Sequence, residues 1–220
     1  FGPGEDFEDY PRDLKQDRQL AEEAGVDVIF APEAKQLYPH GYATYVDVEG
    51  ITQTLCGASR PGHFRGVCTV VSKLFNIIQP QVAIFGNKDF QQLAVIKRMT
   101  LDLNLPVEIL GLSIFREPDG LAMSSRNVYL TEDQRPQALV LSQSLKKARK
   151  LVAAGQKDVA EIILQLKTEI NRQPAACIDY VQICHQLSLE DQLQVDSDSV
   201  LLLAVYIGNT RLIDNGFLMD

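Results

Sequence analysis

The feature that most constrains the fold is an alternation of helical segments with short apolar runs between residues 61 and 110. Residues 61–79 and 89–104 carry apolar side chains at helical spacing, whereas 82–85 and 107–110 are continuous apolar runs typical of buried strands. Because the connections are short, each helix is expected to return the chain to a parallel neighbouring strand. The pattern predicts an α/β protein with a parallel, doubly wound sheet.

Other segments extend this prediction in both directions. A helix is expected at 10–24, and strands are expected at 26–30 and 45–48. After Gly111 the order changes to a turn at 117–120, a helix that starts at a capping box in 131–134 and ends before Gly155, and a helix at 158–172. Strands are expected at 178–184 and 199–207. Helices followed by strands indicate a small α+β domain, so we predict two domains, 1–116 and 117–220.

Composition excludes several classes of partner. The net charge of -8 and the isoelectric point near 4.9 argue against a general nucleic-acid binder. No apolar run approaches the roughly 20 residues that cross a bilayer, so no membrane partner is expected. The four cysteines have neither CxxC pairing nor metal-ligand spacing, which favours reduced thiols in a cytoplasmic protein.

The segment Gly86-Asn87-Lys88-Asp89 is the first candidate site. It joins a strand end to a helix start and contains a cation, a combination that α/β proteins use to hold a phosphate ester. Lys88 can neutralise a phosphate, and Asp89 could cap the helix, bind a ribose hydroxyl or help position Mg²⁺. Gln92 follows on the same helical face. The alternative is an ordinary strand–turn–helix with a surface lysine.

Two further segments concentrate polar groups. Residues 123–127, with two serines and Arg126, follow the predicted domain boundary and could close over a polyphosphate; the alternative is a polar loop that caps the next element. In residues 59–66, Arg60 and His63 could line a pocket for an anion, or could simply be solvated groups at a helix entry. Residues 211–215 are expected to form a structural, ion-paired turn.

These segments together resemble one family. The runs Ser59-Arg-Pro-Gly-His-Phe-Arg-Gly66, Gly86-Asn-Lys-Asp-Phe-Gln-Gln92, Asp119-Gly-Leu-Ala-Met-Ser-Ser-Arg-Asn127 and Arg211-Leu-Ile-Asp-Asn215 resemble, in this order, those of pantothenate synthetases (pantoate–β-alanine ligases). The resemblance implies a Rossmann-like nucleotidyltransferase domain, here lacking its first strands, and a smaller C-terminal α+β lid domain.

The resemblance also implies a reaction and a set of site residues. Pantoate would attack the α-phosphate of Mg-ATP to give pantoyl adenylate, and β-alanine would then displace AMP to give pantothenate; the enzymes of this family suggest a homodimer. The residues implied for ATP are Gly86, Asn87, Lys88, Asp89, Phe115 (through its backbone), Met123, Ser124, Ser125 and Arg126. Among them Lys88, Ser124, Ser125 and Arg126 would act on the phosphates as catalytic groups, and Asp89 is the candidate metal ligand. Gln92, Arg60 and His63 would bind pantoate.

The sequence departs from the family at two places. Asn87 stands where the family usually has a charged residue, often Glu. The family's His-x-Gly-His segment, which orients ATP, does not occur in the 220 residues, and Phe1 resembles the residue directly after the glutamine that clamps pantoate. The chain alone is therefore expected to be essentially inactive. A non-catalytic nucleotide-binding or assembly module remains the alternative, whereas a dinucleotide-dependent oxidoreductase is excluded because no G-x-G-x-x-G follows a strand.

Overall fold

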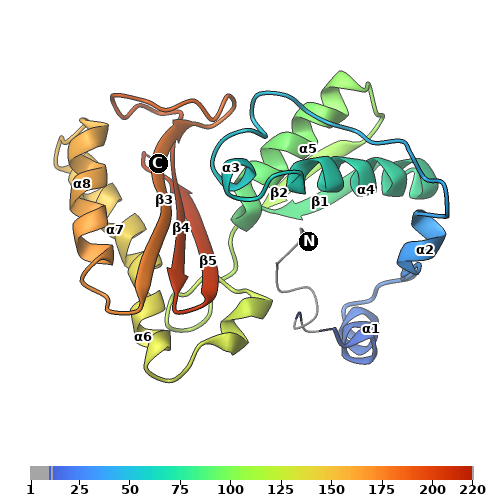
Figure 1. Ribbon diagram of the computed structural model, residues 1–220, viewed down its shortest axis with the longest axis horizontal. Helices are drawn as coiled ribbons and strands as arrows, with labels where there is room; N and C mark the ends of the chain where they lie inside the picture. Colours follow the sequence, from blue (N-terminus) through green and yellow to red (C-terminus); the bar gives the residue numbers. More distant parts are fainter. Residues whose placement is uncertain (1–9, 11, 220) are drawn as a thin grey trace.

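The computed structural model describes residue 10 and residues 12–219, which form two halves that lie side by side (Figure 1). The N-terminal half contains α1 (Leu14–Glu23), α2 (Ala34–Leu37), α3 (Cys56–Ser59), α4 (His63–Ile78), β1 (Val82–Gly86), the 3₁₀ turn η1 (Asn87–Asp89), α5 (Phe90–Asp102) and β2 (Glu108–Leu112). The C-terminal half contains η2 (Ser125–Tyr129), α6 (Gln134–Ala138), α7 (Val140–Ala153), α8 (Val159–Ile170), β3 (Ala176–His185), β4 (Ser199–Ile207) and β5 (Thr210–Phe217).

In the N-terminal half, β1 and β2 pair in parallel, as the alternation predicted. Helices α4 and α5 cover one face of this sheet, where Phe75 of α4 meets Phe85 of β1 with ring centroids 6.5 Å apart. The other face exposes Ile84 and Leu112, which are 60% and 55% accessible. The α/β class is confirmed, but within the described residues the helices cover one face of the sheet rather than both.

The strands expected at 26–30 and 45–48 are wrong. Residues 26–30 make no strand ladder within the described structure, and Val28 is 80% exposed. Residues 45–48 run beside α4, where the backbone N–H of Val46 donates to Thr69 Oγ1 at 3.0 Å and Val48 packs into the core under α4. An apolar run becomes a strand only if another strand accepts its backbone hydrogen bonds, and this information is not local.

In the C-terminal half, β3, β4 and β5 form an antiparallel sheet in sequence order. Alternate residues of β4 enter different cores: Leu201 and Leu203 join α7 and α8 in the helix-side core, whereas Val200 and Leu202 face the N-terminal half in the interhalf core. Figure 1 shows α7 and α8 on the side of this sheet away from the N-terminal half. Strand β4 is therefore buried on both faces.

The helix boundaries follow local signals. Thr131 Oγ1 accepts from the backbone N–H of Gln134 at 3.3 Å, and the Gln134 side chain accepts from the backbone N–H of Thr131 at 3.2 Å, which confirms the capping box. The expected long helix is divided at Leu139 into α6 and α7. Gly155 follows α7 with a φ of +94°, the left-handed conformation that favours glycine at a helix end.

Strand β3 contains a β-bulge at Asp179. Ile178 pairs with Val205 and Tyr180 pairs with Ala204, so Asp179 is an extra residue without a partner on β4. On one side of the bulge Ile178 packs against the helix-side core, and on the other Tyr180 packs against the interhalf core. The bulge thus changes which side chains of β3 face the N-terminal half.

Both halves contribute side chains to the contact between them. Phe90 of α5 and Phe217 of β5 form an edge-to-face pair with centroids 5.9 Å apart, and Ser59 Oγ donates to Asp179 Oδ1 at 2.8 Å. The interhalf core includes Leu55 together with residues of β4. None of the helices in the described part of the chain is long and apolar enough to cross a membrane.

Candidate active site

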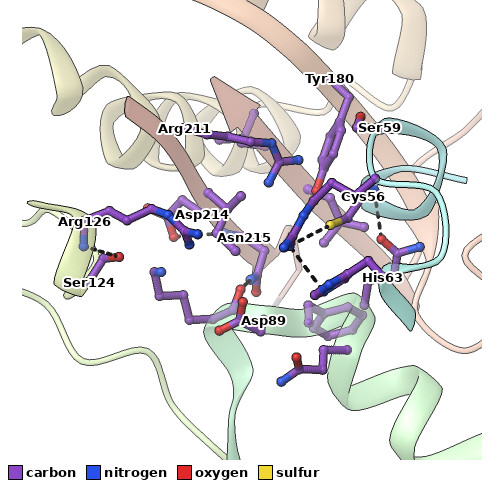
Figure 2. Close-up of a pocket in the computed structure, with 18 of the residues that line it drawn as sticks. Cys56, Ser59, His63, Asp89, Ser124, Arg126, Tyr180, Arg211, Asp214 and Asn215 are labelled. Carbon is purple, nitrogen blue, oxygen red and sulfur yellow. Dashed lines mark hydrogen bonds between the residues drawn. The ribbon is translucent and has the colours of Figure 1, made fainter. Parts of the chain in front are cut away.

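A cavity of about 710 Å³ lies between the two halves (Figure 2). Three groups of elements form its walls: the N-terminal ends of α4 and α5 with α3, the η2 turn, and strands β3 to β5. Of the predicted site residues, those that line it are Arg60, His63, Lys88, Asp89, Gln92, Ser124 and Arg126. The cavity therefore brings together residues from all three predicted segments.

The Gly86–Asp89 segment forms the floor of the cavity. Strand β1 ends at Gly86, the 3₁₀ turn η1 follows, and α5 begins at Phe90. Asp89 is the N-cap residue of α5 but makes no side-chain capping hydrogen bond there, so its exposed carboxylate is directed at the cavity instead. Gln92, one turn into α5, lines the same space.

The Lys88 amine is partly withdrawn from water. Burial lowers its pKa, the nearby Arg126 guanidinium lowers it further, and the carboxylates of Asp89 and Asp214 oppose this shift. The lysine thus lies among charges from both halves. A cation with little water around it attracts an anionic ligand more strongly than a solvated one does.

Asn87 has a packing role that the sequence did not reveal. A β-carbon at Gly111 of β2 would collide with the side-chain oxygen of Asn87 and with Leu93. Glycine at this position therefore leaves the space that Asn87 occupies above the end of the sheet. Of the Gly86–Asp89 segment, only Lys88 and Asp89 line the cavity directly, and Gly86 and Asn87 lie behind them.

The η2 segment forms a second wall. Ser124 Oγ accepts from the backbone N–H of Arg126 at 3.3 Å, and both residues line the cavity. Buried Asn127 anchors the turn, because its amide donates to Ala122 O at 3.1 Å and to Glu117. Ser125 points elsewhere, and its hydroxyl donates to the Tyr10 hydroxyl at 3.0 Å.

The predicted nucleotide contacts Phe115 and Met123 lie outside the cavity wall. Their side chains are 72% and 57% exposed. They are adjacent to each other, since the backbone N–H of Met123 donates to the carbonyl of Phe115 at 2.9 Å. Both therefore lie on the segment that joins the two halves.

The third wall carries Arg60 and His63. Gly62 has a φ of +80° and starts α4, so the Pro61-Gly62 turn sets the direction in which the helix enters the site. Arg60 Nη1 lies 3.2 Å from His63 Nε2 and 3.8 Å from Cys56 Sγ. These contacts hold the guanidinium at the cavity surface.

Gln91 supports this wall from below, although only its neighbour Gln92 was a predicted site residue. The Gln91 side chain is 5% exposed. Its Nε2 donates to the carbonyls of Ile51 and Thr54, each at 2.8 Å, and its Oε1 accepts from the backbone N–H of Cys56 at 3.0 Å. Both glutamines border the cavity, but the Gln91 side chain is buried in these backbone contacts, whereas Gln92 is partly exposed.

Residues 211–215, expected to form a structural turn, instead lie within β5. The expected turn is wrong, whereas the expected ion pairing is present: Arg211 pairs with Asp179, and Asp214 pairs with Arg116. Arg211, Ile213 and Asn215 alternate along one face of the strand and line the cavity. Arg211 binds Asp179 Oδ2 through Nε and Nη2 at 3.0 and 2.7 Å. Because Leu212 and Ile213 are adjacent, the segment has no alternation of polar and apolar residues, and its local pattern did not predict a strand.

The arrangement of charge restricts what the cavity can bind. Arg60, Lys88, Arg126 and Arg211 line it, whereas the lining carboxylates are Asp89 and Asp214, and Asp214 is bound to Arg116. The described residues contain no cluster of three or more His, Cys, Asp or Glu side chains that could hold a metal ion by themselves. Fold and site together define a two-domain α/β enzyme with a cationic interdomain cleft suited to anionic ligands.

Comparisons with known proteins give the family. The sequence model of the pantoate-beta-alanine ligase family matches residues 1–217, and the chain belongs to this family. It is 56% identical over 220 residues to pantothenate synthetase of Syntrophotalea carbinolica, a match that covers 100% of this chain and 78% of the relative. It is 58% identical over 215 residues to that of Heliobacterium modesticaldum, covering 98% and 76%.

Solved structures agree. Pantothenate synthetase from Thermus thermophilus matches with a TM-score of 0.96 at 46% identity, covering 100% of this chain and 80% of that one. The pantoate-beta-alanine ligase of Francisella tularensis, solved in complex with beta-gamma ATP and beta-alanine, matches with a TM-score of 0.75 at 32% identity, covering 97% and 73%. The family expected from the four sequence motifs is confirmed.

Proposed function

We propose that this chain serves the ATP-dependent condensation of pantoate with β-alanine, through a pantoyl-adenylate intermediate that releases pyrophosphate and then AMP. The observation that carries the proposal is the convergence of Lys88, Arg126, Arg60 and Gln92 on one cavity between the halves. The Francisella relative, solved with ATP and β-alanine, supports the same ligands here. No observation favours the alternative of a non-catalytic module.

The polyphosphate end of the site is proposed at η1 and η2. Lys88, Ser124 and Arg126 would hold the phosphates, and Ser125 would contribute its backbone while its hydroxyl binds Tyr10. Adenylation develops negative charge on phosphoryl oxygens, which cations already fixed in place stabilise without further reorganisation. Gly86 and Asn87 would contact the nucleotide through the turn backbone, and Phe115 and Met123 would lie beside the adenine.

The acyl end is proposed at the opposite wall. Gln92 would donate to a pantoate hydroxyl, and Arg60, held by His63, would neutralise the pantoate carboxylate before it attacks the α-phosphate. Water must be kept from the mixed anhydride until β-alanine arrives, and closure of the two halves around the cavity would serve this purpose.

The residues of the cavity fit a magnesium ion only if ATP supplies most of its ligands. Mg²⁺ in nucleotide sites commonly takes one or two protein carboxylates and completes its shell with phosphate oxygens and water. Asp89, whose carboxylate is not used as a helix cap, is the residue that would hold it. The ion would supply charge neutralisation at the phosphates.

Binding and turnover test the proposal separately. Calorimetric titration with a non-hydrolysable ATP analogue and with pantoate should show binding of both, and Arg126→Ala should weaken the analogue without affecting pantoate. Failure of the unmodified chain to bind either ligand would refute the proposed site.

Turnover is expected to need the His-x-Gly-His segment, which these 220 residues do not contain. A coupled assay of AMP release should therefore detect no pantoate- and β-alanine-dependent turnover by the chain alone. Turnover that depends on both substrates would contradict the expected inactivity and support the ligase function directly. We also propose a cytoplasmic homodimer with domains 1–116 and 117–220, which light scattering and limited proteolysis would test.

A further inference from the structure

Asn215 connects the C-terminal half to the turn that carries Lys88. Its side-chain amide donates to the carbonyl oxygen of Asn87 at 2.9 Å and to that of Lys88 at 2.8 Å. The donor is on β5 and the acceptors are on η1, so the contact joins residues more than a hundred positions apart. An amide NH₂ group has two N–H donors, and here both bind this one turn.

The surroundings of Asn215 hold it in place. The residue is 6% exposed, and its backbone N–H donates to Asp214 Oδ1 at 2.9 Å. Asp214 binds Arg116 Nη1 and Nη2 at 2.7 and 2.9 Å, and its side chain is 1% exposed. Arg116 lies on the segment that joins the two halves, so a chain of contacts runs from this segment through β5 to the turn. Figure 2 shows the Asp214 and Asn215 end of this chain.

The two hydrogen bonds from Asn215 determine how Lys88 is oriented. Fixing the carbonyls of Asn87 and Lys88 fixes the peptide planes on either side of the Lys88 Cα, and therefore the direction in which its side chain leaves the backbone. In this direction the Lys88 amine interacts electrostatically with Arg126 and Asp214, which both lie outside η1. Without the Asn215 amide, the turn would keep its sequence but lose its attachment to β5.

We propose that Asn215 is a positioning residue: through its two hydrogen bonds to the η1 turn it aims the Lys88 ammonium at the phosphates of the bound nucleotide. Asn215 touches no reacting atom and acts only through Lys88. This inference rests on the proposed function for the identity of the ligand, but the attachment of the η1 turn to β5 can be measured without any ligand.

The test compares two Asn215 variants. Asn215→Ala removes both donors, and Asn215→Asp keeps the shape but presents a carboxylate to two carbonyls. Hydrogen exchange of the peptide that contains η1 is followed by mass spectrometry, and it should be about tenfold faster in both variants, because the turn has lost its attachment to β5. The dissociation constant of a non-hydrolysable ATP analogue should rise about tenfold, whereas that of pantoate should stay within about twofold.

Leu189→Ala is the matched control for weakened contact between the halves. Leu189 is 3% exposed in the interhalf core and lines the second cleft between the halves, so its truncation costs stability without touching η1. The control should leave both the exchange at η1 and the affinity for the ATP analogue unchanged. Unchanged exchange at η1 in both Asn215 variants, or an equal change in Leu189→Ala, overturns the proposal. If the unmodified chain binds no nucleotide, the proposed function fails, but the exchange at η1 still decides whether Asn215 holds the turn.

Discussion

Replacing Gln91 by methionine should destabilise the N-terminal half substantially, although Gln91 is not one of the predicted site residues. The side chain makes three hydrogen bonds, to the carbonyls of Ile51 and Thr54 and from the N–H of Cys56. Methionine has nearly the same length but none of these donors or acceptors. The substitution therefore leaves three backbone groups without their partner.

The magnitude follows from these three groups. A buried partner left without its hydrogen bond costs about 1–3 kcal/mol. Ile51, Thr54 and Cys56 are partly accessible, so water can replace part of each bond and the lower end applies. The sum is about 3 kcal/mol, which corresponds to a urea midpoint lowered by about 1.5 M at an m-value of about 2 kcal/mol/M.

Urea unfolding followed by circular dichroism measures the loss, and hydrogen exchange at the Cys56 amide locates it. Gln92→Met is the matched control, because Gln92 faces the cavity and its loss should leave stability within about 0.5 kcal/mol while weakening pantoate binding. The reasoning is wrong if Gln91→Met costs less than about 1 kcal/mol, if the Cys56 amide keeps its protection, or if both variants lose equal stability.

Three further outcomes are expected. Lys88→Met should raise the free energy of unfolding at pH 7 while weakening nucleotide binding, because burial lowers the pKa of the Lys88 amine in the folded protein. The unfolded chain therefore binds more protons than the folded one, so the stability of the unmodified protein should approach that of the variant as the pH rises toward about 10.4. Urea unfolding of both proteins at pH 7 and pH 10 would show this. Arg116→Met should cost about 3 kcal/mol by leaving buried Asp214 unpaired, and a double-mutant cycle with Asp214→Asn should recover more than half of it. Gly111→Ala should cost about 2 kcal/mol in thermal unfolding, and adding Asn87→Ala should relieve part of that cost unless the two side chains do not meet.

The local parts of the fold were predictable from the sequence. Helices α4, α5 and α8 and strands β1 and β2 follow from hydrophobic periodicity, and the capping box at Thr131 and the glycine after α7 mark helix ends through nearest-neighbour chemistry. The expected strand at 26–30 failed because strand formation depends on a partner, which periodicity within the segment cannot supply.

Part of the candidate site was also predictable from the sequence, and part was not. Lys88, Gln92 and Arg126 stand in compact motifs, and the structure brings them to one cavity. Asn215 was assigned to a structural, ion-paired turn, whereas in the fold it belongs to β5 and lines the cavity. Sequence patterns predict secondary structure poorly where side chains line a binding site instead of a core, and β5 is an example.

The bulge at Asp179 makes the site sensitive to the length of β3 rather than only to its composition. A chain that lacked this one residue could still pair every remaining position of β3 with β4, and the core under α8 would remain filled. Tyr180 would still face the cleft, but the carboxylate that accepts from Arg211 and Ser59 would be lost from it. A single-codon deletion at Asp179 would thus separate folding from binding: it would yield a cooperatively folding protein in which no carboxylate links Ser59 of the N-terminal half to Arg211 of β5.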